Sequence, residues 1–360
     1  MRRTAALIVG GGPAGAAAAI GLARAGRYPL LAERDRETRD ALCGGFLSWT
    51  TLDRLDALGV DAWTLGAHRV ERLAIFAGRR TAEAALPALA AGLSRRTLDA
   101  ALLDRAGEAG VGVERGLAVR AIEGGVARFA DGGEMRPAAT ILATGKHDLR
   151  GHSRPRDDDD PSIGLRWRLA PSTALARLCG GRIELHLMRH GYGGLVLQED
   201  GGGNFCITVR RTRLDAAGGD PARLLADLAA EAPALAARLD AAAAVGAAQA
   251  VANIPYGWRA GDTAPGLYRV GDQAGVIPSL AGEGIGIALA SGSAAAAAVG
   301  SGVPAARFQA AMARRLKSSI TAARGMRGAA EAVVAAPWLL AVMARLPAAM
   351  TLAATMTRLR

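Results

Sequence analysis

The sequence predicts an α/β fold in which a doubly wound parallel sheet carries an inserted, partly antiparallel sheet and a helical C-terminal segment. Three observations lead to this prediction. A short apolar run beginning at residue 5 passes through glycines into an alanine-rich helix. Strand-like pieces recur over residues 66–94 and from about 151 to 250. Residues 304–360 have a helical pattern throughout.

The composition is that of an enzyme-sized globular chain. Its 360 residues are 51% hydrophobic, which is enough for the cores of about two domains. The formal net charge of +11 would suit nucleic acid or an anionic membrane. However, arginine is spread along the whole chain, lysine occurs only at Lys146 and Lys317, and aromatic residues make up 4% of the sequence. We therefore expect no nucleic-acid partner.

The three cysteines indicate a reducing compartment. Cys43, Cys179 and Cys206 are widely spaced and form no CxxC pair, so neither a disulfide framework nor a zinc site is predicted. The apolar run near the first residue is too short for a signal peptide and opens directly into glycines. We therefore expect a cytoplasmic protein.

The first glycine-rich turn predicts a nucleotide site. Gly10, Gly12 and Gly15 form a GxGxxG pattern between a buried strand and a helix, with Pro13 and Ala14 inside the same pattern. In such a turn the backbone approaches a pyrophosphate, and the free N–H groups of the helix face its charge.

An acidic residue after the next strand narrows the choice of nucleotide. Glu33 ends the predicted strand "YPLLAERD", at the distance from the glycines that a dinucleotide-binding motif requires. Its carboxylate can accept hydrogen bonds from both hydroxyl groups of an adenosine ribose. An acid here disfavours a 2′-phosphate, although Arg34 follows directly, so the pattern predicts FAD or NAD.

A second glycine-rich turn, "GDQAGVIPSLAGEGIGIALASG" at residues 271–292, separates FAD from NAD. Asp272 follows a predicted strand and can bond to ribitol hydroxyl groups, while Gly282 and Gly284 open a helix. A reduced flavin ring carries negative charge, which the N-terminus of a helix stabilises. NAD has no part that needs this second site, so the two turns together predict FAD.

These patterns divide the chain into three parts. The FAD-binding domain is discontinuous and comprises residues 1–65, 95–150 and 255–303. The substrate domain comprises residues 66–94 and 151–254, and the C-terminal helical cap comprises residues 304–360. The run "RPRDDDDPS" from Arg154 is predicted to be a solvated linker. In the cap, Pro337 and Pro347 interrupt apolar runs shorter than the roughly 20 residues that a membrane span requires. We expect a helical cap or a surface that contacts a bilayer.

The motifs resemble those of a known group of flavoproteins. "GGGPAG" at the first turn, "CGGFLS" at residues 43–48 and the late turn are similar to the superfamily of geranylgeranyl reductases and aromatic hydroxylases of the p-hydroxybenzoate hydroxylase type, the reductase branch being closer. The resemblance extends from residue 1 to about residue 300. It implies a Rossmann-like FAD-binding domain with an inserted antiparallel-sheet substrate domain.

The resemblance also implies roles for individual residues. Arg96 would contact the FAD pyrophosphate, Pro278 and residues 282–285 would lie along the flavin ring, and Cys43 would lie near its reactive edge. Further cofactor contacts are implied at Gly44, Val119, Thr144, Gly145, Gly271 and Ile285.

Two departures from the family patterns bear on the substrate and on the electron donor. The reductase segment YxWxFP becomes "YGGLVL", so Tyr192 matches but Gly194 replaces the tryptophan, and we expect a differently shaped lipid cavity. The hydroxylase segment ADG, which helps to bind NAD(P)H, becomes Ala143-Thr144-Gly145. A ferredoxin or a separate flavin reductase is therefore expected as an electron donor beside NAD(P)H itself.

The reaction expected is reduction of an alkene in a hydrophobic, lipid-like or polyketide-like substrate, with Cys43, Tyr192 or a bound water as the proton donor. The main alternative is an FAD-dependent monooxygenase that hydroxylates a phenolic or polyketide-derived ring. A more distant alternative is a flavin electron carrier without turnover. Halogenases of the same fold are expected to carry a WxWxIP segment and a lysine near the substrate, and neither is recognised in the sequence.

Overall fold

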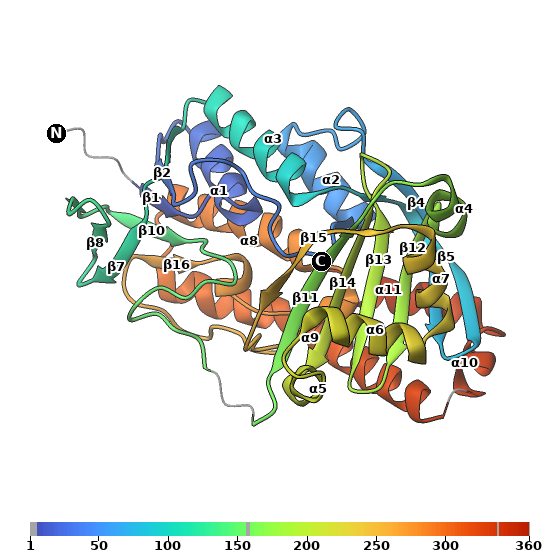
Figure 1. Ribbon diagram of the computed structural model, residues 1–360. Coiled ribbons are helices and arrows are strands. Elements are labelled where there is room, and N and C mark those ends of the chain that lie inside the picture. The colour runs from blue at the N-terminus through green and yellow to red at the C-terminus, as the bar shows by residue number, and fades with distance from the viewer. Residues whose placement is uncertain (1–5, 156–158, 337, 360) are drawn as a thin grey trace.

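The computed structural model describes residues 6–155, 159–336 and 338–359 (Figure 1). Residue 5 of the expected first strand, residues 156–158 of the expected linker and Pro337 lie outside these ranges. The described chain forms two large sheets and one small sheet, with helices packed on both large sheets (Figure 1).

A five-stranded parallel sheet carries the first glycine turn and Glu33. Its strand order is β16-β10-β1-β2-β6, and every neighbouring pair is parallel. The strands are β1 (Ala6–Val9), β2 (Leu30–Glu33), β6 (Gly112–Arg115), β10 (Ala139–Leu142) and β16 (Leu267–Arg269). The doubly wound sheet predicted from the sequence is thereby confirmed.

Five helices share one apolar core with the parallel sheet: α1 (Pro13–Arg24), α2 (Trp49–Leu58), α3 (Arg95–Glu108), α8 (Gly284–Gly300) and the first part of α9 (Ala305–Ala335). Helices α1 and α8 lie side by side and approach closely (Figure 1). A Cβ atom on Gly292 would lie 2.1 Å from the carbonyl oxygen of Ala14, and one on Gly21 would lie 2.8 Å from Cβ of Ala296. The alanine and glycine content of these helices therefore lets the two backbones meet.

A small antiparallel sheet covers the opposite face of the parallel sheet. It consists of β7 (Val119–Glu123), β8 (Val126–Phe129) and β9 (Glu134–Met135). Ile122 and Phe129 pack against Leu7 and Leu142. The left-handed Gly124 and its neighbour in the turn between β7 and β8 fold these segments into a hairpin of their own.

An eight-stranded sheet forms the second large layer, in the order β15-β11-β14-β13-β12-β4-β5-β3. The strands are β3 (Phe46–Leu47), β4 (His68–Ala77), β5 (Arg80–Gly92), β11 (Ser162–Leu169), β12 (Gly181–Met188), β13 (Gly191–Leu197), β14 (Gly203–Arg210) and β15 (Ala244–Val251). All neighbours are antiparallel except β12 and β4. The inserted antiparallel sheet is confirmed, with one parallel pair.

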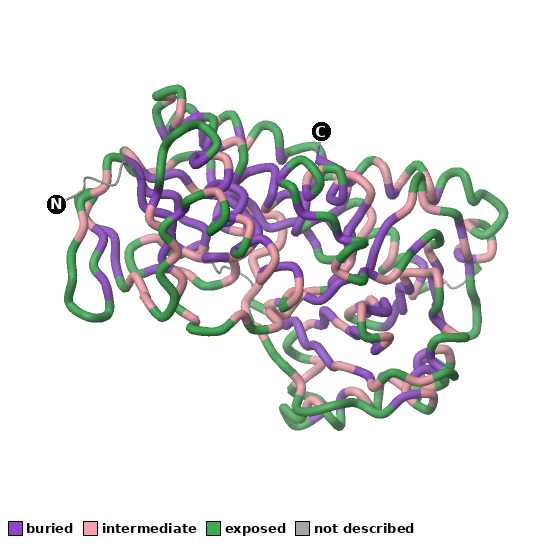
Figure 2. The backbone as a smooth tube through the Cα atoms, turned by 90° about the horizontal axis from the view of Figure 1, so that it is seen from above, coloured by how far each residue is buried: buried purple, intermediate pink, exposed green. Residues whose placement is uncertain are grey.

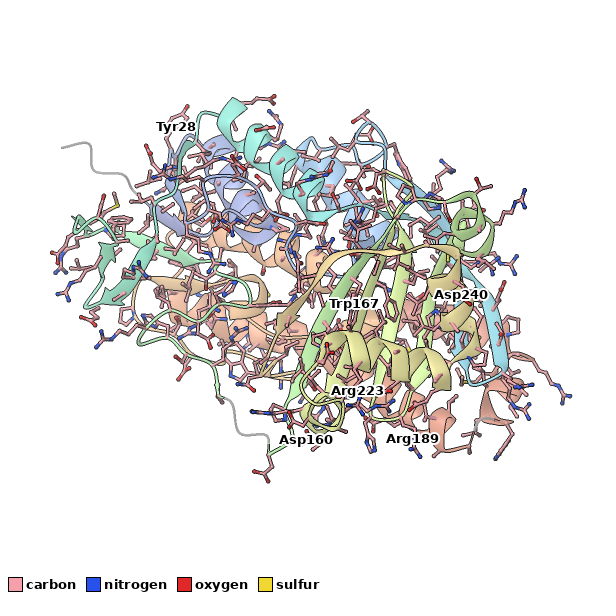
Figure 3. The ribbon with its side chains drawn as sticks, viewed as in Figure 1. Tyr28, Asp160, Trp167, Arg189, Arg223 and Asp240 are labelled. Atoms are coloured by element: carbon pink, nitrogen blue, oxygen red, sulfur yellow. The ribbon has the colours of Figure 1, made fainter. Side chains whose placement is uncertain are left out.

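Alternate residues of this sheet face two different sets of helices. Trp167 on β11 and Phe205 on β14 belong to the core shared with α4 (Thr173–Cys179), α6 (Pro221–Glu231) and α7 (Pro233–Ala241) (Figure 3). The short helix α5 (Arg211–Ala216) precedes α6. On the other face, Leu185 and Tyr192 share a core with α9 (Ala305–Ala335), α10 (Trp338–Met343) and α11 (Pro347–Met356). Figure 2 shows buried residues running through the interior of both layers.

The segment expected to be a solvated linker is anchored at its first residue. Arg154 is buried, with Nε 2.7 Å from Asp148 Oδ1 and Nη2 2.7 Å from the carbonyl oxygen of Lys146. The prediction was wrong at this position, because a guanidinium with several donors can be satisfied inside the protein when a carboxylate and carbonyl groups surround it.

Among the described helices, none is both long and apolar enough to cross a bilayer.

Candidate active site

One large pocket lies where the two large sheets meet. Its wall on the parallel-sheet side is formed by residues 12–14 of the first glycine turn, residues 42–46 and residues of the late turn between Gly271 and Ile285. Segments from near the start of the chain and from its last third therefore border the same space. The structure brings Gly12, Gly271 and Ile285 together, as the two-turn interpretation requires.

The first turn exposes a helix end to this pocket. A Cβ on Gly15 would lie 1.9 Å from Gly10 O, and Gly10 has a positive φ of 106° and packs against Ala143. Both glycines thus serve the close packing of the turn. Gly12 is the N-cap of α1 and no side chain caps the helix, so its first N–H groups remain for a ligand. Gly12, Pro13 and Ala14 line the pocket.

Glu33 lies at the outer end of the first turn. Its carboxylate accepts hydrogen bonds from the backbone N–H of Gly11 at 2.6 Å and of Asp35 at 2.8 Å. These bonds hold the acid at the carboxyl end of β2, where the motif requires it. Arg34 is half exposed and lies 4.0 Å from Asp35. Val119 is the first residue of β7 in the small sheet and is not among the residues that line the pocket.

The late turn exposes a second helix end. Gly282 has a positive φ of 62°, and Glu283 is the N-cap of α8 without a side-chain cap. Asp272, Gly282, Gly284 and Ile285 line the pocket. Pro278 is buried and is not among the lining residues, whereas its neighbours at positions 277 and 279 are.

The shape of the pocket fits FAD. Two uncapped helix N-termini, of α1 and α8, border one continuous space and suit a ligand with a pyrophosphate at one end and a ring that accepts negative charge at the other. Cβ atoms on Gly44, Gly145 and Gly284 would meet no atom within 4 Å, so the absence of side chains at these three positions widens the pocket. Thr144 turns away and donates from Oγ1 to His147 O at 2.6 Å.

The arginine that lines the pocket beside the first glycine turn is Arg95, not Arg96. Its Nε and Nη2 donate to the two oxygens of Asp99 at 2.8 and 2.6 Å, and a Cβ on Gly12 would lie 3.4 Å from Nη2. Arg96 is exposed. Consecutive residues of a helix point about 100° apart, so the arginine predicted to reach the pyrophosphate faces away while its neighbour faces the turn.

The electrostatics of Arg95 also involve the cysteine of the "CGG" segment. Burial alone would lower the pKa of Arg95, but Asp99 and Cys43 raise it well above its usual range. The Cys43 thiol is close enough to the guanidinium to influence its pKa. Arg95 therefore connects the first glycine turn with Cys43.

The backbone around Cys43 is held by side chains from two other segments, the loop at Lys146 and strand β14. Lys146 Nζ donates to Leu42 O at 2.5 Å, and Cys206 Sγ donates to Cys43 O at 3.0 Å. Asn204 Nδ2 donates to Cys43 O at 2.9 Å and to the next carbonyl at 2.7 Å. Burial raises the pKa of Cys206 to about 12, so this thiol stays a donor. Sequence reasoning missed these supports because they depend on contacts across the two sheets.

Four hydroxyl groups meet on the substrate side of the pocket. Ser279 Oγ lies 2.8 Å from the hydroxyl of Tyr192, 2.9 Å from Thr208 Oγ1 and 3.0 Å from the hydroxyl of Tyr256. Thr208 and Tyr256 lie 3.1 Å apart. Burial raises the pKa of Tyr192 and of Tyr256 above the usual range. Of this hydroxyl cluster, the sequence had suggested Tyr192 alone.

The remainder of the substrate side is apolar and is closed by the C-terminal helices. Its lining includes Leu73, Leu86, Ile183, Leu185, Met326 and Ala354. Gly194, where the reductase pattern has tryptophan, also lines this part and leaves it wide. Thr357 and Arg358 complete the wall beside the late turn. None of these C-terminal contacts was predicted, because no motif marks them.

Comparison with known proteins identifies the cofactor-binding part. The FAD binding domain family matches residues 3–145. This part of the chain is an FAD binding domain. FAD, the predicted cofactor, is thereby confirmed.

Curated relatives match part of this flavoprotein. Menaquinone reductase of Mycobacterium tuberculosis is 28% identical over 172 residues, which cover 45% of this chain. The match spans 40% of the length of that relative.

Solved structures share the fold over nearly the whole flavoprotein. The flavin-dependent brominase Bmp2 has a TM-score of 0.76 at 17% identity, covering 96% of this chain and 93% of its own. A geranylgeranyl bacteriochlorophyll reductase-like protein of Thermoplasma acidophilum has a TM-score of 0.72 at 20% identity, covering 92% and 87%. PqsL of P. aeruginosa has a TM-score of 0.70 at 18% identity, covering 91% and 96%.

Proposed function

We propose that this flavoprotein reduces a carbon–carbon double bond in an apolar, lipid-like substrate. The observation that carries the proposal is the composition of the substrate side of the pocket, where apolar side chains surround one cluster of hydroxyl groups. The charged lining residues Arg95, Lys146, Asp272 and Arg358 belong instead to the walls beside the two turns and Cys43. The apolar lining of the substrate side favours a hydrocarbon over a charged metabolite, because burying apolar surface contributes roughly 25 cal/mol per Å² to the free energy of binding.

Reduction of an alkene adds a hydride to one carbon and a proton to the other. When bound, reduced FAD supplies the hydride. Tyr192 is the proposed source of the proton. Its hydroxyl lies 2.8 Å from Ser279 Oγ, and the backbone N–H of Leu280 donates to the Tyr192 oxygen at 3.2 Å. The raised pKa keeps this hydroxyl protonated at neutral pH, as a proton donor requires.

The rest of the hydroxyl cluster would return the proton to Tyr192. Ser279, Thr208 and Tyr256 can each donate and accept, and their mutual distances of 2.9 to 3.1 Å allow a proton to pass between them. Cys43 is the second candidate for the proton donor, since its thiol is half-buried in the pocket beside Arg95.

The electron donor is proposed to be a ferredoxin or a separate flavin reductase, with NAD(P)H as the alternative. The support is that residues 143–145 after β10 carry no acid, where the hydroxylase pattern has one for NAD(P)H.

Hydroxylation of a phenolic ring is the second candidate function. It is favoured by the same hydroxyl cluster, because Tyr192, Thr208 and Ser279 could orient a phenol by hydrogen bonds as readily as they could supply a proton.

The test is to reduce the FAD-loaded protein without oxygen and to add candidate isoprenoid lipids and phenols. A lipid that speeds flavin reoxidation and gains two hydrogen atoms by mass spectrometry would support the reductase. A product that forms only with oxygen and gains one oxygen atom would overturn it in favour of hydroxylation. Reoxidation that no substrate accelerates, in the presence of a ready electron acceptor, would favour an electron carrier.

A further inference from the structure

The C-terminal helices expose an unusual concentration of large apolar side chains. The described residues include eight exposed large hydrophobic side chains, and five of these lie between positions 338 and 356. We define the C-terminal apolar patch by these five: Trp338, Val342, Leu346, Leu352 and Met356, which are 58%, 46%, 56%, 61% and 58% exposed. Scattered single residues of this kind need no explanation, but a contiguous group marks an interaction surface.

The patch lies on the outer sides of a hairpin of two consecutive helices. On α10, Trp338 and Val342 are one turn apart and exposed, whereas Leu340 is wholly buried. On α11, Leu352 and Met356 are likewise one turn apart, and the opposite side of that helix is buried. Leu346 lies in the connection between the two helices. Each helix therefore has an inner side for the core and an outer apolar side that no described residue covers.

The C-terminal segment that carries the patch is basic. Residues 304–360 contain nine arginine and lysine residues and one acid, Glu331. That acid is paired with Arg327 at 3.3 Å. Arg345 is exposed next to Leu346 within the patch. An apolar surface with a surplus of positive charge is complementary to an anionic lipid bilayer, in which the apolar side chains enter the headgroup region and the arginines meet lipid phosphates.

Two exposed arginines lie at the start of a strand that adjoins the hairpin. Strand β5 packs against both α10 and α11, and Thr351 on α11 donates to Ala85 O at 2.8 Å. Arg79 and Arg80 are exposed at the turn that leads into β5. Figure 1 shows β5 and α10 at the same end of the molecule.

We propose that the C-terminal apolar patch docks this flavoprotein on the surface of an anionic lipid bilayer. The hairpin lies on the membrane and does not span it. Its inner side also carries Ala354, which lines the substrate side of the pocket, so one helix would separate the bilayer from that cavity. This proposal rests on the exposure of the patch and on the positive charge of the C-terminal segment, and it does not depend on the reaction proposed above.

The experiment uses the full-length, FAD-loaded protein and flotation with two kinds of vesicle, phosphatidylcholine alone and phosphatidylcholine mixed with phosphatidylglycerol. The double variant Val342→Glu with Leu352→Glu removes two apolar side chains from the patch. Its matched control, Tyr28→Glu with Val245→Glu, makes the same charge change at two other exposed apolar positions, 60% and 57% exposed. Tyr28 lies at the end of the molecule opposite to α10 (Figures 1 and 3).

The wild-type protein and the control are expected to bind the anionic vesicles and to release them at high salt, whereas the patch variant should bind at least about tenfold more weakly. A wild-type protein that does not bind anionic vesicles at low salt would overturn the proposal, and so would a patch variant that binds as the control does. A wild-type dimer in light scattering that the patch variant abolishes would overturn it too, because a second copy would then cover the patch.

Quenching by brominated lipid provides a measurement that requires no destabilising change. Fluorescence of Trp338, taken as the difference between the wild type and Trp338→Phe, should be quenched by brominated anionic vesicles. A Trp338 contribution that the brominated lipid leaves unchanged, in protein that floats with the vesicles, would place another surface on the bilayer and would refute the proposal.

Discussion

Arg358 donates a hydrogen bond of 2.6 Å from Nη1 to Oε2 of Glu283, a carboxylate that is wholly buried at the start of α8. The same guanidinium donates to Gly282 O at 3.2 Å and lies over the ring of Trp49, 4.9 Å from its centroid. The C-terminal segment thus holds the turn that presents the N-terminus of α8 to the pocket.

Replacement of Arg358 by Ala is expected to destabilise the protein. Glu283 would keep only Ser48 at 3.1 Å and Arg54 at 3.5 Å as side-chain partners. Loss of one partner of a buried ion pair costs about 3 kcal/mol, so the free energy of unfolding measured by urea denaturation should fall by that amount. The FAD content should fall as well, because the turn at Gly282 loses its anchor. Arg345→Ala, at an exposed position, should change neither quantity.

Arg95 and Arg96 should differ sharply in their effect on FAD affinity. Arg95→Ala removes the cation beside the first glycine turn, whereas Arg96→Ala changes an exposed side chain. A hydrogen bond to a charged group contributes about 1.5–3 kcal/mol, or roughly tenfold to a hundredfold in affinity. Titration of the apoprotein with FAD, followed by flavin fluorescence, should show this loss for Arg95→Ala alone. Equal losses for both variants would contradict the position that the structure gives to Arg95.

The sequence was sufficient to predict the parts of the site that consist of backbone. Gly12 and Gly284 could be placed because a glycine turn between a strand and a helix determines where a helix end points, and that geometry is local. The side of a helix that faces the ligand is not local. It depends on packing, and for this reason Arg96 was chosen where Arg95 lines the pocket.

Contacts between distant segments could not be predicted from one sequence. Ser279 and Thr208 meet only because β14 and the late turn lie on the same side of the pocket. Arg358 reaches Glu283 from the other end of a helical segment that carries no motif. The exposed position of Trp338 and Leu352 likewise follows from how the hairpin packs on β5.

Tyr192→Phe should separate catalysis from cofactor binding. The variant keeps the aromatic ring and removes the hydroxyl that is proposed to donate the proton. Loss of a general acid lowers turnover by about a hundredfold or more, whereas the FAD affinity should not change. Stopped-flow reoxidation of the reduced protein by substrate gives the rate, and flavin titration gives the affinity. Turnover equal to that of the wild type would transfer the proposed role to Cys43 or to water.

The pH dependence of the free energy of unfolding in the alkaline range should show that the Tyr192 hydroxyl is buried. Its folded pKa is raised by burial, whereas a tyrosine in the unfolded chain ionises near pH 10. The contribution of the buried, protonated hydroxyl to the free energy of unfolding is therefore complete below about pH 10 and is lost as the pH rises towards the folded pKa. In urea denaturation above about pH 10, the free energy of unfolding of the wild type should fall more steeply than that of Tyr192→Phe. Parallel curves would mean that this hydroxyl is accessible to solvent.

The close approach of α1 and α8 brings the two glycine turns to one pocket, and Gly292 makes that approach possible. In Gly292→Ala the new Cβ would lie 2.1 Å from Ala14 O, so the helices must separate. Overpacking of this kind costs about 1–3 kcal/mol, and FAD affinity should fall because the turns move apart. Gly325→Ala on α9, where a Cβ meets no atom within 4 Å, is the control. It should stabilise the protein by roughly 0.5–1 kcal/mol, since alanine favours a helix. Calorimetry and flavin titration of both variants would reveal the difference, and a Gly292→Ala protein as stable as the control would show that the helices do not pack at this distance.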